Sequence, residues 1–130
     1  MSRQALALGA LTATALLAAA GAAKAENWVY VGRNQYDSVY EIDSDSFSRD
    51  GQEVVIRLRV HYGAKSPPNG NGTDSYLARR RVFCNENAYQ DLHTDYFAQG
   101  RLNSSAEVEE KRTAVSGSIG EDVVKKACAR

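Results

Sequence analysis

The residues best suited to chemistry lie in the short stretch Asp-Leu-His-Thr-Asp at positions 91–95. On a strand, side chains two residues apart share one face, so Asp91, His93 and Asp95 are predicted to point the same way. Carboxylates and imidazoles are groups that bind metal ions or transfer protons. Side chains on one face stand about 7 Å apart along a strand, too far to share one ion without ligands from a neighbouring strand. We therefore predict no metal and no cofactor.

Four arginines accompany these residues on the same predicted face of the sheet. They alternate with apolar residues in the segments EVVIRLRVHYG (53–63) and SYLARRRVFCN (75–85). One interpretation is a charged platform that binds a protein ligand or, through 91–95, a metal. The other is a ladder of cross-strand ion pairs, each contributing only tenths of a kcal/mol, which is common on exposed sheets. The candidate binding face comprises Arg57, Arg59, Arg79, Arg81, Asp91, His93 and Asp95.

An enzyme of a familiar class would need further groups that the sequence lacks. It contains no GxSxG, HExxH or glycine-rich phosphate loop, and these are the motifs that carry hydrolase, metalloprotease and nucleotide chemistry. The two histidines, His61 and His93, are the main candidate bases. We therefore predict a non-catalytic protein with no catalytic residues.

Residues 1–25 have the layout of a secretory signal peptide. Arg3 is followed by an Ala/Leu-rich segment and by small residues that favour cleavage after Ala25. The alternative, a retained anchor helix, is disfavoured because the apolar run consists mostly of alanine. No cysteine lies near the cleavage point, so we predict an exported protein that is not a lipoprotein and has no membrane anchor. Residues 26–130 are then a single domain.

The charge of residues 26–130 is nearly balanced. Removing Arg3 and Lys24 leaves 14 basic and 16 acidic residues, a net charge near −2. This balance argues against a general nucleic-acid-binding protein.

Export also determines how the two cysteines are interpreted. In an oxidising compartment, the pair Cys84 and Cys128 is predicted to form a structural disulfide. Cys84 shares a strand face with Val82, and Cys128 lies on the apolar stripe of a predicted helix. The bond therefore requires that helix to pack on that face of the sheet.

The surrounding pattern predicts an α+β fold: an antiparallel sheet of about six strands with one disulfide-tethered C-terminal helix on one face. Period-two alternation or β-branched and aromatic residues predict strands at 27–32, 38–43, 53–63, 75–85 and 88–98, with a less regular last strand within 106–115. Asp50 and Gly51 indicate a hairpin turn. Ser118 and Glu121 form a capping-box pattern at the start of the helix.

Two features have more than one interpretation. The loop from Ala64 to Asp74 contains both prolines of residues 26–130 and is either a binding loop or a tolerated insertion. Arg80 points toward the face assigned to the helix. It lies either at the helix edge with its aliphatic stem buried or in an ion pair with Glu121 or Asp122.

Six short motifs carry a resemblance to a known family. They are WVYVG, VYEIDSDS, VHYG, RRRVFCN, YQDLHTDYF and SGSIGEDVVKKAC, and they extend from Trp28 to Cys128. Together they resemble the surface-adhesin protein E family of exported domains from Gram-negative bacteria. The chain departs from the family pattern in having Ser116 where a proline is expected, and in lacking a tryptophan shortly before that turn.

The resemblance implies a six-stranded antiparallel sheet tied to a C-terminal helix by the Cys84–Cys128 disulfide. The member that names the family is a surface lipoprotein that binds host matrix and plasma proteins and can dimerise. The resemblance therefore implies a protein ligand, a host matrix or envelope protein, and a homodimer, for which the strand Trp28–Gly32 is a candidate edge. Without a lipid-acceptor cysteine, the location is periplasmic or secreted to the cell surface. The alternative function is a periplasmic inhibitor or envelope-stress protein of the lysozyme-inhibitor type.

Overall fold

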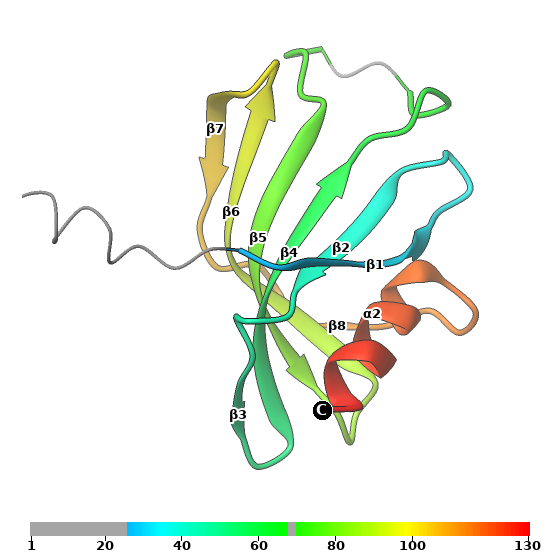
Figure 1. Ribbon diagram of the computed structural model, residues 1–130, viewed down its shortest axis with the longest axis vertical. Coiled ribbons are helices and arrows are strands. Elements are labelled where there is room, and N and C mark those ends of the chain that lie inside the picture. The colour runs from blue at the N-terminus through cyan, green and yellow to red at the C-terminus, as the bar shows by residue number, and fades with distance from the viewer. Residues whose placement is uncertain (1–25, 68–69) are drawn as a thin grey trace, which may run out of the picture.

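The computed structural model describes residues 26–67 and 70–130, which form an open, twisted antiparallel sheet and one helix (Figure 1). The predicted signal peptide, 1–25, lies outside the described residues. The strands are β1 Trp28–Arg33, β2 Val39–Asp43, β3 Ser48–Asp50, β4 Glu53–His61, β5 Ser75–Phe83, β6 Ala88–Ala98, β7 Arg101–Ala106 and β8 Arg112–Thr113, and the helix is α2 Ile119–Cys128. The main strand order is β1-β2-β4-β5-β6-β7, with β3 paired to β4 and β8 paired to β6. The predicted α+β class with six main strands and a C-terminal helix is confirmed.

The core lies between the sheet and α2, on the face called here the inner face. Strand β4 alternates strictly, and its residues Val54, Ile56, Leu58 and Val60 are fully buried. They pack with Val123, Val124 and Ala127 on one side of α2. Full burial of each such aliphatic side chain contributes about 2 kcal/mol. The helix covers only part of the inner face. Among the described residues, no helix is long and apolar enough to cross a membrane.

Helix α2 begins at a capped end and finishes at a disulfide. The Ser118 hydroxyl accepts a hydrogen bond from the Glu121 N–H at 3.3 Å, which confirms Ser118 as the predicted N-cap; the reciprocal bond goes to Gly117 instead of Ser118. The Glu121 carboxylate accepts in return from the Gly117 N–H at 3.3 Å. At the other end, Cys84 and Cys128 form the predicted disulfide, with their Cα atoms 5.7 Å apart. The bond joins α2 to the end of β5.

One extra residue in β6 changes which face its side chains occupy. Arg79 is paired with His93, but the next residue, Arg80, is paired with Asp91, so Leu92 is a β-bulge. Asp91 therefore lies on the inner face with Arg80. Its predicted position on the charged outer face is wrong, because period-two alternation holds only along an unbroken strand.

The region after β6 also differs from the prediction. Strand β7, Arg101–Ala106, was not expected, since its sequence is polar and its residues are almost all exposed at the sheet edge. The predicted strand within 106–115 contains only the two-residue β8. Strand β1 forms the opposite edge, as expected, and the homodimer through Trp28–Gly32 stays a prediction.

The loop between β4 and β5 is anchored at both ends in its described part. Near its start, the Ser66 and Ser38 hydroxyls are 3.2 Å apart. Near its end, the carbonyl of Asn71 accepts a hydrogen bond from the Asn103 side chain at 3.0 Å. Residues 68–69 lie outside the described residues, and a binding role for the loop stays a prediction.

We expect Gly63→Ala to destabilise the protein, because Gly63 packs directly on the chain before β2. A Cβ atom there would lie 2.1 Å from the Tyr36 carbonyl oxygen, and backbone must move to relieve that clash. The expected loss in the free energy of unfolding is about 2 kcal/mol, measured by urea denaturation. Gly70→Ala is the control, since a Cβ at Gly70 meets no atom of the described residues within 4 Å. Equal stability of the two variants would contradict this packing.

Candidate functional site

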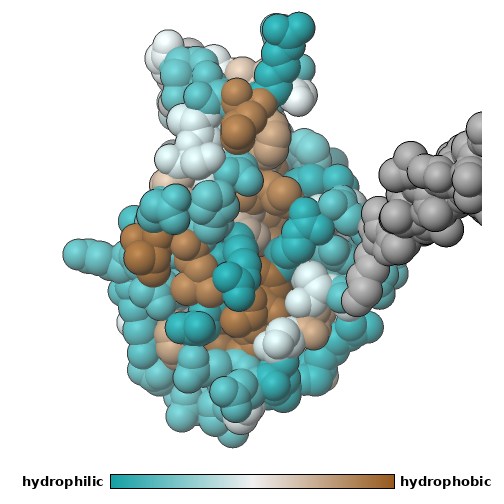
Figure 2. All heavy atoms as spheres, turned by 90° about the vertical axis from the view of Figure 1, so that its left-hand side faces the viewer, coloured by the Kyte–Doolittle hydropathy of each residue, from teal (hydrophilic) through white to brown (hydrophobic). Residues whose placement is uncertain are grey.

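The outer face of the sheet, which points away from α2, combines hydrophobic surface with charged side chains. Figure 2 shows a hydrophobic area in the middle of this side, bordered by hydrophilic residues. Half-buried Val55 and Leu77 come from β4 and β5, where they alternate with the core residues. This face therefore has an apolar centre that the sequence pattern did not suggest.

Most of the outer arginines are engaged in ion pairs. Arg57 contacts Glu26 at 3.0 Å and Asp43 at 3.5 Å. Arg59 contacts Glu41 at 3.0 Å, and Arg81 contacts Glu53 at 3.3 Å. The exposed pairs among these contribute about 0–1 kcal/mol each. Arg79 is exposed and makes no ion pair with another described residue.

Trp28 is a further residue of this face that the sequence analysis did not assign to it. The Arg59 guanidinium lies 4.2 Å from the centre of the Trp28 ring, and that of Arg57 lies 5.6 Å from it. Such cation–π contacts attract both guanidinium groups to the ring. The chain has one tryptophan, but its place on the arginine-rich face follows only from the pairing of β1 with β2 and of β2 with β4, which the sequence pattern does not give.

The structure brings four of the predicted face residues together around Leu77. Arg57, Arg79, His93 and Asp95 line a shallow depression of about 200 Å³. Arg59 and Arg81 lie on the same face, outside this depression. Asp91 lies on the other side of the sheet, so the Asp-x-His-x-Asp set is divided between the two faces.

The outer face contains a histidine, an aspartate and a serine in contact, but they are not arranged as a catalytic triad. The Asp95 carboxylate lies 2.8 Å from His93 Nε2 and accepts from the Ser105 hydroxyl at 2.6 Å. The carboxylate thus sits between the other two groups, whereas activation of a serine requires the imidazole in that place. Within 26–67 and 70–130, no three His, Cys, Asp or Glu side chains are grouped to hold a metal ion.

His93 is expected to make the stability of the outer face depend weakly on pH. The hydrogen bond to Asp95 is the main cause that raises the pKa of His93, and the nearby charges of Asp95 and Glu107 add to it. A raised folded-state pKa gives stability that is present below pH 6.5, the unfolded value, and is lost as pH rises through the folded pKa. We expect His93→Gln to remove this loss of stability at pH values above 6.5. Thermal denaturation across that range is the measurement, and identical pH profiles would contradict it.

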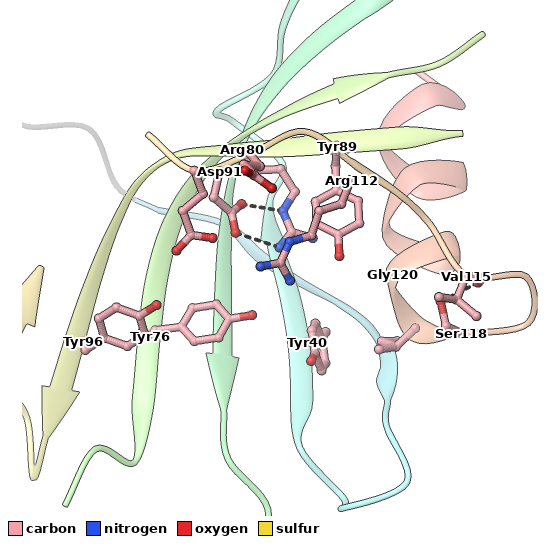
Figure 3. Close-up of a pocket in the computed structure, with 13 residues that line it drawn as sticks. Tyr40, Tyr76, Arg80, Tyr89, Asp91, Tyr96, Arg112, Val115, Ser118 and Gly120 are labelled. Atoms are coloured by element: carbon pink, nitrogen blue, oxygen red, sulfur yellow. Dashed lines mark hydrogen bonds and ion pairs between the residues drawn. The ribbon is translucent and has the colours of Figure 1, made fainter. Parts of the chain in front are cut away.

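The inner face contains a cavity beside the region covered by α2. Its volume is about 470 Å³, and Figure 3 shows the side chains that surround it. The lining residues are Tyr40, Tyr76, Arg80, Tyr89, Asp91, Tyr96, Glu109, Glu110, Arg112, Val115, Ser118, Ile119 and Gly120. They come from β2, β5, β6, β8, the start of α2 and the loops that precede β8 and α2. Of these residues, the sequence analysis had assigned only Asp91 to a site.

A buried ion pair lies at the wall of this cavity. Arg80 donates to the two Asp91 oxygens at 2.7 and 3.1 Å, and its guanidinium lies 4.1 Å from the centre of the Tyr89 ring. The Arg80 side chain is 6% exposed and that of Asp91 is 14% exposed. Burial acts to lower the pKa of Arg80, but the hydrogen bond and charge of Asp91 outweigh it and raise that pKa. The partner of Arg80 is thus Asp91, rather than Glu121 or Asp122.

Tyrosines from neighbouring strands form a ladder across the inner face. The rings of Tyr62, Tyr76 and Tyr96 contact one another edge to face, with 5.9 Å between successive centres. Burial is the main cause that raises the pKa of each of these three phenols. Their hydroxyl groups therefore stay protonated at physiological pH and can donate hydrogen bonds.

Comparison with known proteins identifies relatives of this architecture. The sequence profile of the family described as surface-adhesin protein E matches residues 28–129. A structure of Haemophilus influenzae protein E has 16% identity and a TM-score of 0.54, and the match covers 82% of this chain and 87% of that one. A second crystal form of the same protein has 18% identity and a TM-score of 0.52, with 77% and 87% covered. No curated protein sequence matches the chain.

Proposed function

Because the chain belongs to the surface-adhesin protein E family, we propose that it is an exported protein-binding module without a catalytic step of its own. Export is supported by the signal-peptide pattern of residues 1–25. The proposed ligand is a host matrix or envelope protein, and the proposed contact surface is the outer face.

The observation that carries this proposal is the combination of an apolar centre and a charged border on the outer face (Figure 2). Protein interfaces commonly have such an apolar centre with a polar rim, and arginine and tryptophan are enriched among the residues that contribute most affinity. Here Trp28 and the arginines around it occupy a face that no described helix covers. Arg79, exposed and without an ion pair to a described residue, is available to a partner's carboxylate.

The absence of a catalytic step is supported by the arrangement of the candidate groups. His93 is held by Asp95 and lies near Glu107, whereas the nearby Ser105 hydroxyl is held by Asp95 and not by the imidazole. The two cysteines are joined in the disulfide, so neither is a free thiol nucleophile.

The test is a binding assay with purified residues 26–130. The protein is passed over immobilised host matrix and plasma proteins and purified envelope proteins, with Haemophilus influenzae protein E as the positive control. We expect saturable binding to at least one partner, weakened about tenfold by Arg79→Glu. Lys126→Glu, an equal charge change on the exposed side of α2, should leave binding unchanged. If the positive control binds and the wild-type chain binds no partner, the proposal is wrong.

A further inference from the structure

The cavity on the inner face contains an unusual number of hydrogen-bond donors that the protein itself does not use. Tyr40, Tyr76, Tyr89 and Tyr96 all line it, and none of their hydroxyl groups is in a hydrogen bond with another described residue. None of these hydroxyls is among the fully buried unpaired atoms of the described residues, so they reach the open space of the cavity. Figure 3 shows the hydroxyls of Tyr76, Tyr89 and Tyr96 directed into the space between the strands and α2. Buried or half-buried tyrosines usually place their hydroxyl on a partner. The donors therefore converge on a place where a ligand can accept them.

Two guanidinium groups add positive charge to the same space. Arg80 uses Nε and Nη2 for Asp91, while its Nη1 makes no hydrogen bond to another described residue. Arg112, from β8, lines the cavity and is in no ion pair with a described residue. Figure 3 shows both guanidinium groups pointing into this cavity. Arg80 is fixed by its buried bond to Asp91, so its free N–H group is already oriented before any ligand arrives.

The orientation of the rings indicates the sign of the ligand. A cation is bound by the electron-rich faces of aromatic rings, whereas the ring edges and hydroxyl hydrogens carry positive charge. In this cavity the face of Tyr89 is covered by Arg80, and Tyr76 and Tyr96 contact each other edge to face. The tyrosines offer hydroxyl groups to the cavity, which suits an anion.

We propose that this cavity binds a carboxylate, supplied by an aspartate or glutamate side chain of a protein that contacts the inner face, a surface separate from the outer face proposed above. The identity of that source depends on the proposed protein-binding function, but the carboxylate site itself does not. Planar guanidinium groups and phenol hydroxyls match the two oxygens of a carboxylate. Glu109 and Glu110 also line the cavity, and with Asp91 they give it three carboxylates against two guanidinium groups. The bound carboxylate is therefore held by directed hydrogen bonds and not by net charge, and ligands that carry two or more negative charges are disfavoured.

The test uses small blocked amino acids as probes of residues 26–130. N-acetyl-aspartate methylamide, its asparagine analogue and its lysine analogue are titrated into ¹⁵N-labelled protein and followed by NMR. We expect the aspartate probe to give saturable shifts at Tyr76, Tyr89 and Tyr96, and the asparagine probe to bind about tenfold more weakly. Equal binding of the two probes, preference for the lysine probe, or shifts confined to the outer face would overturn the proposal.

Arg112→Gln separates a role of the cavity from an effect on folding. Arg112 is exposed and outside the core, so the variant keeps the fold, and we expect about tenfold weaker binding of the aspartate probe. Lys126→Gln removes the same charge from α2 away from the cavity and should bind as the wild type does. Unchanged binding by Arg112→Gln would overturn the proposal. If protein partners bind but the aspartate probe does not, the carboxylate site is wrong and the proposed function stands. If the aspartate probe binds but no protein partner does, the proposed function is wrong and the carboxylate site stands.

Discussion

Replacing Asp91 with alanine is expected to lower the free energy of unfolding by about 3–5 kcal/mol, among the largest effects of any single substitution in this protein. The reason is the burial of its partner. Arg80 keeps its charge and is 6% exposed, and without Asp91 its guanidinium would be buried with no counter-charge. Urea denaturation followed by tyrosine fluorescence or circular dichroism measures the loss.

Two controls separate the buried pair from an ordinary ion pair. Glu53→Ala breaks the exposed Arg81–Glu53 contact and should cost less than about 1 kcal/mol. The double variant Arg80→Leu with Asp91→Leu removes both charges and should recover much of the stability lost by Asp91→Ala, because two apolar side chains need no partner. If Asp91→Ala costs no more than Glu53→Ala, the buried pair does not contribute as its geometry indicates.

Replacing both cysteines with serine is the other large expected change. The disulfide connects residues 44 apart in sequence, and closing a loop of that size stabilises a protein by about 4 kcal/mol in the chain-entropy model. This approaches the total stability of a small domain. The measurement is thermal denaturation of Cys84→Ser with Cys128→Ser beside the oxidised wild type.

A reductant provides the internal control for this variant. Adding it should destabilise the wild type toward the level of the double variant and leave the variant unchanged. The loss should also appear first in α2, which has ten residues and is too short to be stable alone in water. Amide exchange that stays slow at the buried Val123 and Val124 in the variant would contradict this account.

Much of the fold was predictable because its signals are local. The strict alternation of β4, the capping pattern of Ser118 and Glu121, and the pair of cysteines each reflect physics within a few residues or a single covalent bond. Strand β7 lacked such a signal. Its polar residues extend the sheet at an exposed edge, where backbone pairing and not side-chain burial determines the structure.

The cavity was less predictable because it depends on pairing between distant strands. Its tyrosines come from β2, β5 and β6, and they meet only when Tyr40, Tyr76 and Tyr96 share the inner face. The pairing of Arg80 with Asp91 depends in addition on the bulge at Leu92, and no glycine or turn residue there predicts a bulge. Period-two alternation alone assigned Asp91 to the opposite face.

The bulge also divides strand β6 into two segments whose side chains alternate between the faces in opposite phase. From Ala88 to Asp91 one parity of positions faces inward, and after Leu92 the other parity does. A substitution in this strand changes one side chain, whereas an insertion or deletion of a paired residue moves every side chain on one side of it to the opposite face of the sheet. We expect deletion of Leu92 alone to leave Asp91 paired with Arg80 and His93 with Arg79, because it removes only the unpaired residue. Deletion of a paired residue elsewhere in β6 should instead turn the residues on one side of it to the opposite face, so the length of this strand, and not only its composition, is under constraint.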